Sequence, residues 1–428
     1  MLTSSARALL WSLAVLMVAI LGLPAIAAAA SDPPPASGGG GSGSGPLKVF
    51  ILAGQSNMQG HAHVRTLDAM DLDPGTAAIL KEMRTADGAP RVCEDIWISS
   101  LGSASDERIG RLTAGFGAEA GGPKIGPEFT FGLYTQKLLD EPILIIKVAW
   151  GGKSLHTDFR PPGAGPYQFN EQQLQQFREQ GNDVDTLRAD AAAASGRSYR
   201  LMIDHIKMVL SDIQRVYPGY RPQQGYELTG FVWFQGWNDM VDSGAYPNRD
   251  RPGGYDTYST LLTQFIRDVR RDLAAPDMLF LIGVMGVGGP IDDYPPEAQR
   301  YKEVHRNFRL AMAAPAALPE FEGSVAAVST AEYWDMEVVA LRAREDRIKP
   351  QIEALESRIK DGALSREDGE AMLSRLYENE FTARELMLLR ESTSNFDFHY
   401  MGSARIVARI GKAFAETMVA MIEQRGRQ

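Results

Sequence analysis

The sequence predicts a three-layer α/β/α protein, in which helices cover both faces of a parallel five-stranded sheet. Five short runs are rich in apolar and β-branched residues, and segments with the apolar periodicity of helices lie between them. Continuous apolar runs are typical of parallel strands that are buried on both faces. The alternation of strands and helices along the chain is typical of the α/β class.

Each expected element is identified by its own residues. The expected strands, in chain order, are Val49–Ala53, Ile143–Ala149, Phe231–Phe234, Met278–Val284 and Val325–Val328. Helical periodicity is clearest at Tyr199–Val216, Tyr255–Leu273 and Glu297–Ala313. A last amphipathic helix follows residue 399, because apolar residues recur there at every fourth position, namely Ile406, Ile410, Phe414 and Met418.

Two stretches depart from this alternation. Residues 160–198 are expected to form a long loop with a short helix. Residues 338–392 are expected to form two charged helices around a turn at 361–364, and Ser365 with Asp368 predicts the start of the second helix. A solvated helical hairpin inserted in the domain is preferred to a dimerising arm or a lid.

The first 46 residues are expected to precede the folded domain. Residues 1–30 combine a positive charge, an apolar run and a small-residue stretch, which is the pattern of a secretory signal peptide. A retained membrane anchor is less favoured, because the apolar run is short for a membrane span. Residues 31–46 are rich in Pro, Gly and Ser, as in a linker. The folded domain is therefore expected at 47–428, in a secreted or periplasmic protein.

Composition limits the function classes. The chain has 428 residues with 44% hydrophobic and 23% charged content, and its formal net charge is -10. An acidic protein of this kind is poorly suited to binding nucleic acid or an anionic membrane surface. Cys93 is the only cysteine, so the expected export is not accompanied by a disulfide framework.

Polar residues follow the first expected strand directly. Gly54, Gln55 and Ser56 stand where the apolar run ends. Ligands of parallel α/β sheets bind at the carboxyl ends of the strands, so Ser56 is a candidate nucleophile. The α/β-hydrolase elbow G-x-S-x-G does not fit, because Met58 stands where its second glycine would be. Taken alone, the motif is equally compatible with a hydrogen-bonded turn.

His399 is the candidate general base. It directly precedes the last amphipathic helix, whose packing would hold it rigidly. His205 and His305 lie in helical segments and are expected to be structural or exposed. His61 and His63 form an H-x-H pair, but no third ligand with metal-site spacing accompanies them. No metal ion or cofactor is therefore expected.

Candidate oxyanion donors follow the next two strands. Gly151 and Gly152 come after the second strand, and Asn238 lies shortly after the third. Backbone N–H groups and an asparagine amide are suitable donors to a tetrahedral oxyanion, and the N–H of Ser56 would be another. Each motif alone is equally compatible with a plain turn or a helix cap, whereas the ordered set together with His399 favours a hydrolase site.

The ordered blocks resemble those of the SGNH hydrolases, in which four blocks contribute Ser, Gly, Asn and His. Within that superfamily the chain is similar to the sialate O-acetylesterases, also described as carbohydrate esterase family 6, whose serine block reads G-Q-S-N. Residues 48–60, 142–155, 229–240 and 395–418 carry the likeness. The resemblance implies a flavodoxin-like SGNH-hydrolase fold and metal-independent removal of acetyl groups from sugar esters.

The sequence departs from this pattern at the acid of the implied triad. The superfamily usually has an acid three residues before the histidine, and Phe396 stands at that position. Asp397 is the expected orienting acid, acting from a shifted register. Asn395 or a backbone carbonyl, either of which would leave a Ser–His dyad, is the alternative.

The expected function is therefore a secreted serine esterase that deacetylates carbohydrates through an acetyl-enzyme. Gln55, Gln235, Trp150 and Trp237 are expected to contact the acetylated carbohydrate. Trp233 lies within a strand, where core packing is an equally good interpretation. The alternatives are a carbohydrate-binding protein without activity on the same fold, and a lipase or thioesterase.

Overall fold

A seven-stranded sheet forms the centre of the structure, a computed structural model that describes residues 45–103 and 106–427. The expected signal peptide and nearly all of the expected linker lie outside the described residues. Across the sheet the strand order is β4-β3-β6-β1-β7-β8-β9. The strands are β1 (Leu47–Gly54), β3 (Ile96–Leu101), β4 (Arg108–Arg111), β6 (Ile143–Ala149), β7 (Tyr226–Phe234), β8 (Leu279–Val284) and β9 (Val325–Ser329). All neighbouring pairs are parallel except β3 and β4.

The α/β class is confirmed, but the expected number of five strands is wrong. The five predicted runs correspond to β1, β6, β7, β8 and β9. Strand β3 escaped prediction because Ser99 and Ser100 interrupt its apolar pattern, although both are buried. The hydroxyl of Ser99 lies 2.9 Å from Nε2 of His205, so this buried hydroxyl has a hydrogen-bond partner. Strand β4 is a short antiparallel edge strand without apolar alternation.

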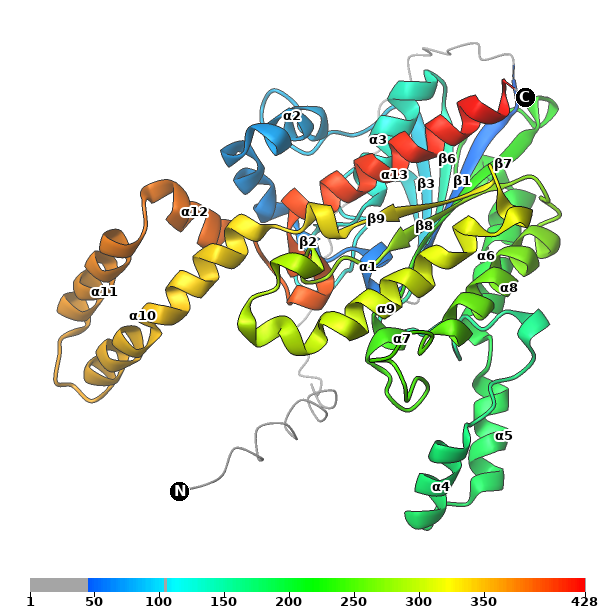
Figure 1. Cartoon of the computed structure of the whole chain (residues 1–428). Coiled ribbons are helices and arrows are strands. Elements are labelled where there is room, and N and C mark those ends of the chain that lie inside the picture. Colours follow the sequence, from blue (N-terminus) through cyan, green and yellow to red (C-terminus); the bar gives the residue numbers. More distant parts are fainter. Residues whose placement is uncertain (1–44, 104–105, 428) are drawn as a thin grey trace, which may run out of the picture. The chain divides into compact units, whose positions relative to one another are not determined.

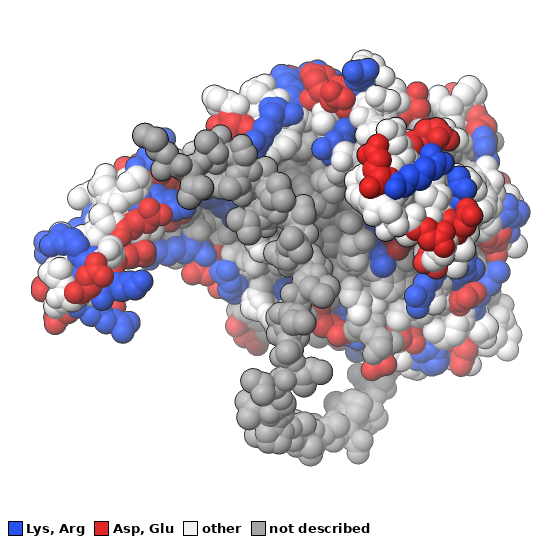
Figure 2. All heavy atoms as spheres, turned by 90° about the horizontal axis from the view of Figure 1, so that it is seen from below, with Lys and Arg blue, Asp and Glu red and all other residues white. Residues whose placement is uncertain are grey.

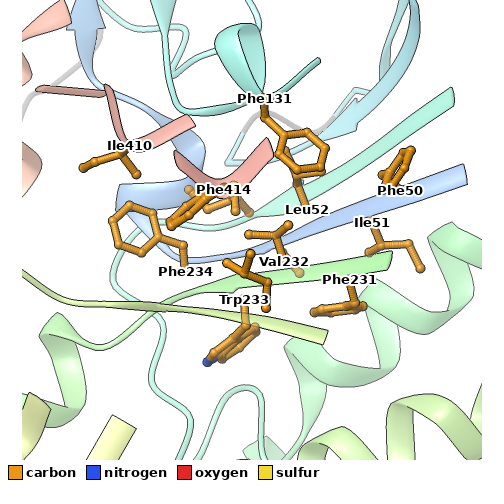
Figure 3. Packing of buried hydrophobic residues seen from close by; sticks show 14 of the residues in the cluster. Phe50, Ile51, Leu52, Phe131, Phe231, Val232, Trp233, Phe234, Ile410 and Phe414 are labelled. Atoms are coloured by element: carbon orange, nitrogen blue, oxygen red, sulfur yellow. The ribbon is translucent and has the colours of Figure 1, made fainter. Parts of the chain in front are cut away.

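Helices cover both faces of the sheet (Figure 1). One face carries α3 (Glu128–Leu139) and α13 (Ala404–Arg425), and the other carries α6 (Arg197–Ser211), α8 (Asp256–Asp272) and α9 (Lys302–Ala313). Side chains of β7 alternate between these layers, as Figure 3 shows for Trp233 and Phe234. The ring of Phe234 packs 5.4 Å from that of Phe414 in α13, and that of Trp233 4.4 Å from Phe265 in α8. Trp233 is thus a core residue.

The stretch 160–198 holds more helix than the sequence predicts. Helix α4 (Glu171–Glu179) and helix α5 (Val184–Ala194) replace the expected single short helix. Asn170 begins α4 with a capping box, in which its side chain accepts from Gln173 N and the Gln173 side chain accepts from Asn170 N. Asp183 caps α5 in the same region. Local capping residues therefore define both helices, although neither has a strong apolar stripe.

The stretch 338–392 forms three helices instead of the expected two. They are α10 (Met336–Lys360), α11 (Arg366–Glu380) and α12 (Ala383–Glu391). The predicted cap at Ser365 is confirmed, since its hydroxyl accepts from Asp368 N at 3.0 Å. A separate cap at Thr382 starts the third helix. These helices share a small apolar cluster of their own, made of Leu341, Ile348, Phe381 and Leu388.

Charged side chains of both signs are interspersed on the face drawn in Figure 2. Within the 336–391 insertion, charged side chains also pair between helices: Arg344 contacts Glu385, and Arg384 contacts Glu337. Such pairs link α12 to α10, and each contributes modestly to the free energy of unfolding because its groups are partly exposed.

Within the described residues, no helix has both the length and the apolar character that crossing a bilayer requires.

Candidate active site

The carboxyl ends of three neighbouring strands bring the polar motifs together. Gly54 at the end of β1 is in register with Ala149 of β6 on one side and with Phe234 of β7 on the other. The residues that follow these strands therefore emerge at one edge of the sheet. Strand β7 approaches Gly54 so closely that a Cβ there would lie 2.1 Å from the carbonyl oxygen of Phe234. Only glycine fits this position, which explains why the strand ends in one.

Ser56 begins the four-residue helix α1 (Ser56–Gln59) immediately beyond that glycine. Its side chain is largely buried, and its Oγ accepts a 3.4 Å hydrogen bond from Gln55 Nε2. Within the described residues, the backbone N–H of Ser56 has no acceptor. A free N–H beside a serine hydroxyl can donate to an oxyanion that forms on an attacked carbonyl group.

A buried lysine fixes the end of α1. Nζ of Lys147 in β6 donates to the carbonyl oxygens of Gln59 and Phe116 and to the carboxylate of Glu128 at 2.7 Å. Both members of this ion pair are fully buried. Burial lowers the pKa of Lys147, and the adjacent Glu128 carboxylate opposes that shift. The short helix that carries Ser56 is therefore attached to the sheet at both ends.

Gln55 is a positioning residue for the motif after β7. Its Nε2 donates to Asn238 Oδ1 at 3.1 Å, and its Oε1 accepts from Gly236 N at 3.0 Å and from Asn238 N at 3.3 Å. Because Oδ1 of Asn238 faces Gln55, Nδ2 is left for another acceptor, and it has none among the described residues. Asn238 lies on α7 (Trp237–Val241) with its amide thus oriented as an oxyanion donor would need.

The structure places Gln55 and Gln235, which the sequence predicts as substrate contacts, beneath the surface of the site. Each side chain is only 1% exposed. Gln235 Nε2 donates to Asp239 Oδ2 at 2.6 Å and to the Lys153 carbonyl at 3.0 Å, while Gln55 makes the contacts given above. The polar atoms of both glutamines have partners among the described residues, so both side chains link neighbouring loops.

The Gly-Gly loop, residues 150–157, lies beside Ser56. A Cβ on Gly151 would lie 3.9 Å from Cβ of Ser56, and Gly151 N donates to Ser103 Oγ at 3.4 Å. Gly152 has a φ of +72°, and its N–H has no acceptor among the described residues. The structure therefore leaves Gly152 as the freer of the two predicted backbone donors. Trp150 is half-buried against the ring of Phe159.

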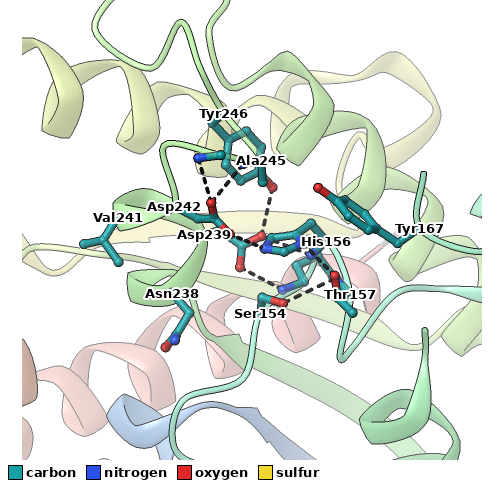
Figure 4. A network of polar contacts seen from close by, with 12 residues as sticks. Ser154, His156, Thr157, Tyr167, Asn238, Asp239, Val241, Asp242, Ala245 and Tyr246 are labelled. Carbon is teal, nitrogen blue, oxygen red and sulfur yellow. Dashed lines mark hydrogen bonds and ion pairs between the residues drawn. The ribbon is translucent and has the colours of Figure 1, made fainter. Parts of the chain in front are cut away.

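Asp239 connects the Gly-Gly loop to the motif after β7 (Figure 4). Its carboxylate accepts hydrogen bonds from the backbone N–H groups of Leu155 and His156, at 2.7 and 3.0 Å, and from the Tyr246 hydroxyl at 2.8 Å. It is fully buried, so these donors replace its hydration. Sequence reasoning did not assign this role, although the buried acid directly follows Asn238 in the same motif. Asp239 thus holds the two loops that carry the candidate oxyanion donors in a fixed relation.

A contact between His156 and Asp242 spans the same two loops. His156 Nε2 lies 3.2 Å from Asp242 Oδ2, and its Nδ1 lies 2.7 Å from the hydroxyl of Thr157. Burial acts to lower the pKa of His156, but hydrogen bonding to Asp242 and the charges of nearby carboxylates raise it overall. This histidine therefore supports the loop structure and is separate from the candidate base.

His399 lies in η10 (Asp397–Gly402), and its partner is Asn395. Nδ1 of His399 is 2.8 Å from Oδ1 of Asn395. Asp397, the expected orienting acid, instead pairs with Arg342 of α10 at 2.8 Å, and its side chain is 63% exposed. The expected role of Asp397 therefore does not fit the geometry. Asn395, rather than Asp397, contacts the ring of His399.

The backbone after His399 adopts an uncommon conformation. Tyr400 and Met401 have positive φ values of 54° and 58°. Left-handed conformations of such residues persist only where surrounding contacts enforce them, and they often occur at functional sites. Here the buried Tyr400 hydroxyl accepts from Gly286 N at 2.9 Å and lies 2.6 Å from Thr330 Oγ1. Tyr400 thus anchors the turn that presents His399.

The ring of His61 stacks on that of His399. The centroids are 3.8 Å apart and the planes differ by 3°. Burial lowers the pKa of His399 to about 4, and burial together with nearby positive charges lowers that of His61 to about 3. Both rings are therefore neutral near pH 7, the state a general base requires. His63 faces elsewhere, with its Nδ1 accepting from Arg65 N, and within the described residues no group of three potential ligands has metal-site geometry.

Ser56 and His399 are not hydrogen-bonded to each other in the described part of the chain. Helix α1 and η10 nevertheless pack against one another. In enzymes without substrate, hydrogen bonds between catalytic groups are often long and tighten only in the complex. The arrangement therefore contains a serine, a neutral histidine and candidate oxyanion donors at one edge of the sheet.

Comparisons with known proteins agree with a carbohydrate-directed site. A family model described as carbohydrate esterase, sialic acid-specific acetylesterase matches residues 46–320, which include Ser56, Gly152 and Asn238 but not His399. No curated protein matches the chain.

Two solved structures are similar to the chain. A protein from Arabidopsis thaliana is 16% identical over 67% of this chain and 86% of its own, with a TM-score of 0.37. A protein described as a novel carbohydrate acetylesterase from Xanthomonas citri is 12% identical over 66% of this chain, with a TM-score of 0.33. The match spans 49% of that second protein, about half of its length.

Proposed function

The chain belongs to the carbohydrate esterase, sialic acid-specific acetylesterase family, and we propose that it is a serine esterase that releases acetate from O-acetylated carbohydrates. One observation carries this proposal: the single buried side chain of Gln55 contacts both Ser56 Oγ and Asn238 Oδ1. The candidate nucleophile and a candidate oxyanion donor are thereby held in one hydrogen-bonded unit. His399, stacked on His61 and bonded to Asn395, supplies the base.

In the proposed first half-reaction, Nε2 of His399 takes the proton of Ser56 as Oγ attacks the acetyl carbonyl carbon. The carbonyl oxygen becomes an oxyanion, which accepts hydrogen bonds from Ser56 N, Gly152 N and Asn238 Nδ2. The intermediate then collapses, the bond from the carbonyl carbon to the sugar oxygen breaks, and His399 returns its proton to that oxygen. The products are the free sugar hydroxyl and an acetyl ester on Ser56.

In the second half-reaction, His399 deprotonates a water molecule that attacks the acetyl-enzyme. The same donors hold the new oxyanion, which collapses as His399 returns the proton to Ser56 Oγ, and the acetic acid that leaves ionises to acetate in water. Asn395 takes the place of the acid of a Ser-His-Asp triad. As the acceptor for Nδ1–H it fixes the tautomer in which Nε2 can accept a proton, but it adds no negative charge.

The decisive test uses the purified protein and its Ser56→Ala variant with p-nitrophenyl acetate and an acetylated xylan. The parent protein should release acetate from both, and Ser56→Ala should lose about 10³-fold or more in kcat/KM. A fluorophosphonate probe should label the parent protein stoichiometrically and leave the variant unlabelled. Full activity of Ser56→Ala would overturn the mechanism, and a parent protein that neither reacts nor labels would indicate a carbohydrate-binding protein.

We also propose that the protein acts outside the cytoplasm, after removal of residues 1–30. The support is the sequence pattern of those residues together with the polymeric, extracellular nature of many acetylated carbohydrates. N-terminal sequencing of the protein recovered from the producing cells tests this. A mature chain that begins near residue 31 is expected, and a retained Met1 in all recovered protein would contradict it.

A further inference from the structure

Three aromatic side chains form a row that leads away from His399. The ring of Trp237 lies 5.5 Å from that of Phe398, and Phe398 lies 5.3 Å from Phe396 with planes only 12° apart. Phe398 also contacts His399 itself, at 4.4 Å between centroids. Trp237 starts α7 next to Asn238, whereas the two phenylalanines flank Asp397 at the start of η10. The aromatic row thus joins the oxyanion side of the site to its histidine side.

The outer end of the aromatic row is open to solvent. Phe396 is 70% exposed, the highest value among the exposed large hydrophobic side chains of the described residues, and Phe398 and Trp237 are half-buried. Leaving a phenylalanine in water forgoes about 1.5–3 kcal/mol of burial energy. Exposed apolar groups that continue from a reactive site mark a binding surface more often than isolated ones do.

We propose that Trp237, Phe398 and Phe396 form a subsite for the sugar rings of an acetylated oligosaccharide or polysaccharide, beyond the ring that carries the acetyl group. This inference rests on the proposed function of the same site. The faces of sugar rings present C–H groups, which are attracted to the electron-rich faces of aromatic rings. Phe396 and Phe398 stack on each other, and Phe396 is the exposed member, on the side of Phe398 away from the site, so a sugar that contacts it would be a further unit of a chain.

The surroundings of the aromatic row favour a sugar chain over an apolar acyl chain. Asp397 stands between Phe396 and Phe398 in the chain, and its exposed carboxylate pairs with Arg342 at 2.8 Å. Carbohydrates combine apolar ring faces with hydroxyl groups, so they match a surface that has aromatic and hydrogen-bonding groups side by side. An acyl chain that covered this ion pair would remove its water without offering a hydrogen bond in return, which is costly.

The test measures kcat/KM of the full chain on acetylated xylo-oligosaccharides of increasing length, with p-nitrophenyl acetate as the reference. For the parent protein, kcat/KM should rise with chain length. Phe396→Ala should lower kcat/KM for the longest substrate about tenfold relative to the reference, mainly through KM, which corresponds to about 1.4 kcal/mol. Phe396→Tyr should restore it, because the ring is kept.

Leu310→Ala is the matched control, since Leu310 is a 65% exposed apolar residue on α9 that belongs to neither the site nor the aromatic row. It should leave kcat/KM unchanged, both for the longest xylo-oligosaccharide and for p-nitrophenyl acetate. If the parent protein hydrolyses neither substrate, the proposed function fails. If it hydrolyses both, but Phe396→Ala does not change kcat/KM for the longest xylo-oligosaccharide relative to p-nitrophenyl acetate, only the subsite is overturned. A loss that instead grows with the acyl length of p-nitrophenyl esters would assign the aromatic row to acyl chains and also overturn the subsite.

Discussion

Oδ1 of Asn395 lies 2.8 Å from Nδ1 of His399. It thus makes the contact that the carboxylate of a Ser-His-Asp triad would make. An amide oxygen can accept the Nδ1–H bond and so orient the ring, but it cannot balance the charge of a protonated imidazole. The nearest acid in sequence, Asp397, is occupied by Arg342 on α10. The insertion formed by α10, α11 and α12 thus contacts the turn that carries the candidate base.

We expect Asn395→Ala to lower kcat by about 10- to 100-fold, equivalent to about 1.4–2.7 kcal/mol of transition-state stabilisation. The ring of His399 would lose its orienting acceptor while its stacking on His61 remained. Asp397→Ala, the matched control two residues away, should change kcat less than about twofold because its carboxylate faces Arg342. Steady-state kinetics with p-nitrophenyl acetate compare the two. A larger loss for Asp397→Ala would return the orienting role to that acid.

The pH dependence of kcat/KM should have its acid limb near pH 4, well below the usual pKa of histidine. Burial lowers the pKa of His399 to about 4, so the neutral ring that acts as base persists down to that pH. Asn395→Asp should move the limb upward by about one pH unit or more, because an adjacent carboxylate favours the charged imidazole. Profiles of kcat/KM against pH for the two proteins test this, and a parent limb near pH 6.5 would contradict it.

Stability should fall as the pH drops from about 6.5 toward 4. The folded-state pKa is about 3 for His61 and about 4 for His305 and His399, whereas all three titrate near 6.5 when unfolded. In that interval the unfolded chain binds more protons, so acid lowers the free energy of unfolding, and the full contribution is present above pH 6.5.

His61→Phe isolates one of these groups, because a phenyl ring keeps the stack on His399 but does not titrate. Urea unfolding at pH 7 and pH 5 should show a smaller loss of stability for His61→Phe than for the parent protein. Equal losses in both proteins would show that His61 is not held neutral by the fold.

The buried Lys147–Glu128 pair should be essential to stability beneath α1. Lys147→Met would leave the Glu128 carboxylate buried without its cation, at an expected cost of about 3–5 kcal/mol in the free energy of unfolding. The double variant Lys147→Met with Glu128→Gln should recover part of that loss, since no buried charge remains. Urea denaturation of the three proteins measures this, and a double variant less stable than Lys147→Met would contradict it.

The sequence predicted the meeting of Ser56, Gly151 and Asn238 because the carboxyl ends of parallel strands lie at one edge of a sheet. It did not predict which side chain of the 395–399 segment faces the histidine. That choice depends on a turn with positive φ at Tyr400 and Met401, which residue preferences do not indicate.

Burial of polar residues was the other obstacle to prediction. Gln55 beside a nucleophile resembles a substrate ligand in sequence, but its partners are the distant Asn238 and Gly236. Strand β3 was missed for the same reason, because the buried hydroxyl of Ser99 pairs with His205, which is remote in the chain, as well as with the nearer Glu107. Contacts of this kind carry no local periodicity, so they become visible only in the folded structure.

Gln55→Glu should lower kcat by about 10²-fold without changing side-chain size. The substitution keeps an oxygen for Gly236 N but replaces the Nε2 donor with a second oxygen that faces Asn238 Oδ1, so the Asn238 amide loses its orientation. Loss of one oxyanion donor costs about 2.7–4 kcal/mol, and Asn238→Ala should reach that range. Because both changes remove the same donor, the double variant should be no slower than Asn238→Ala alone. Losses that instead add in the double variant would show that Gln55 acts on the reaction by a route other than Asn238.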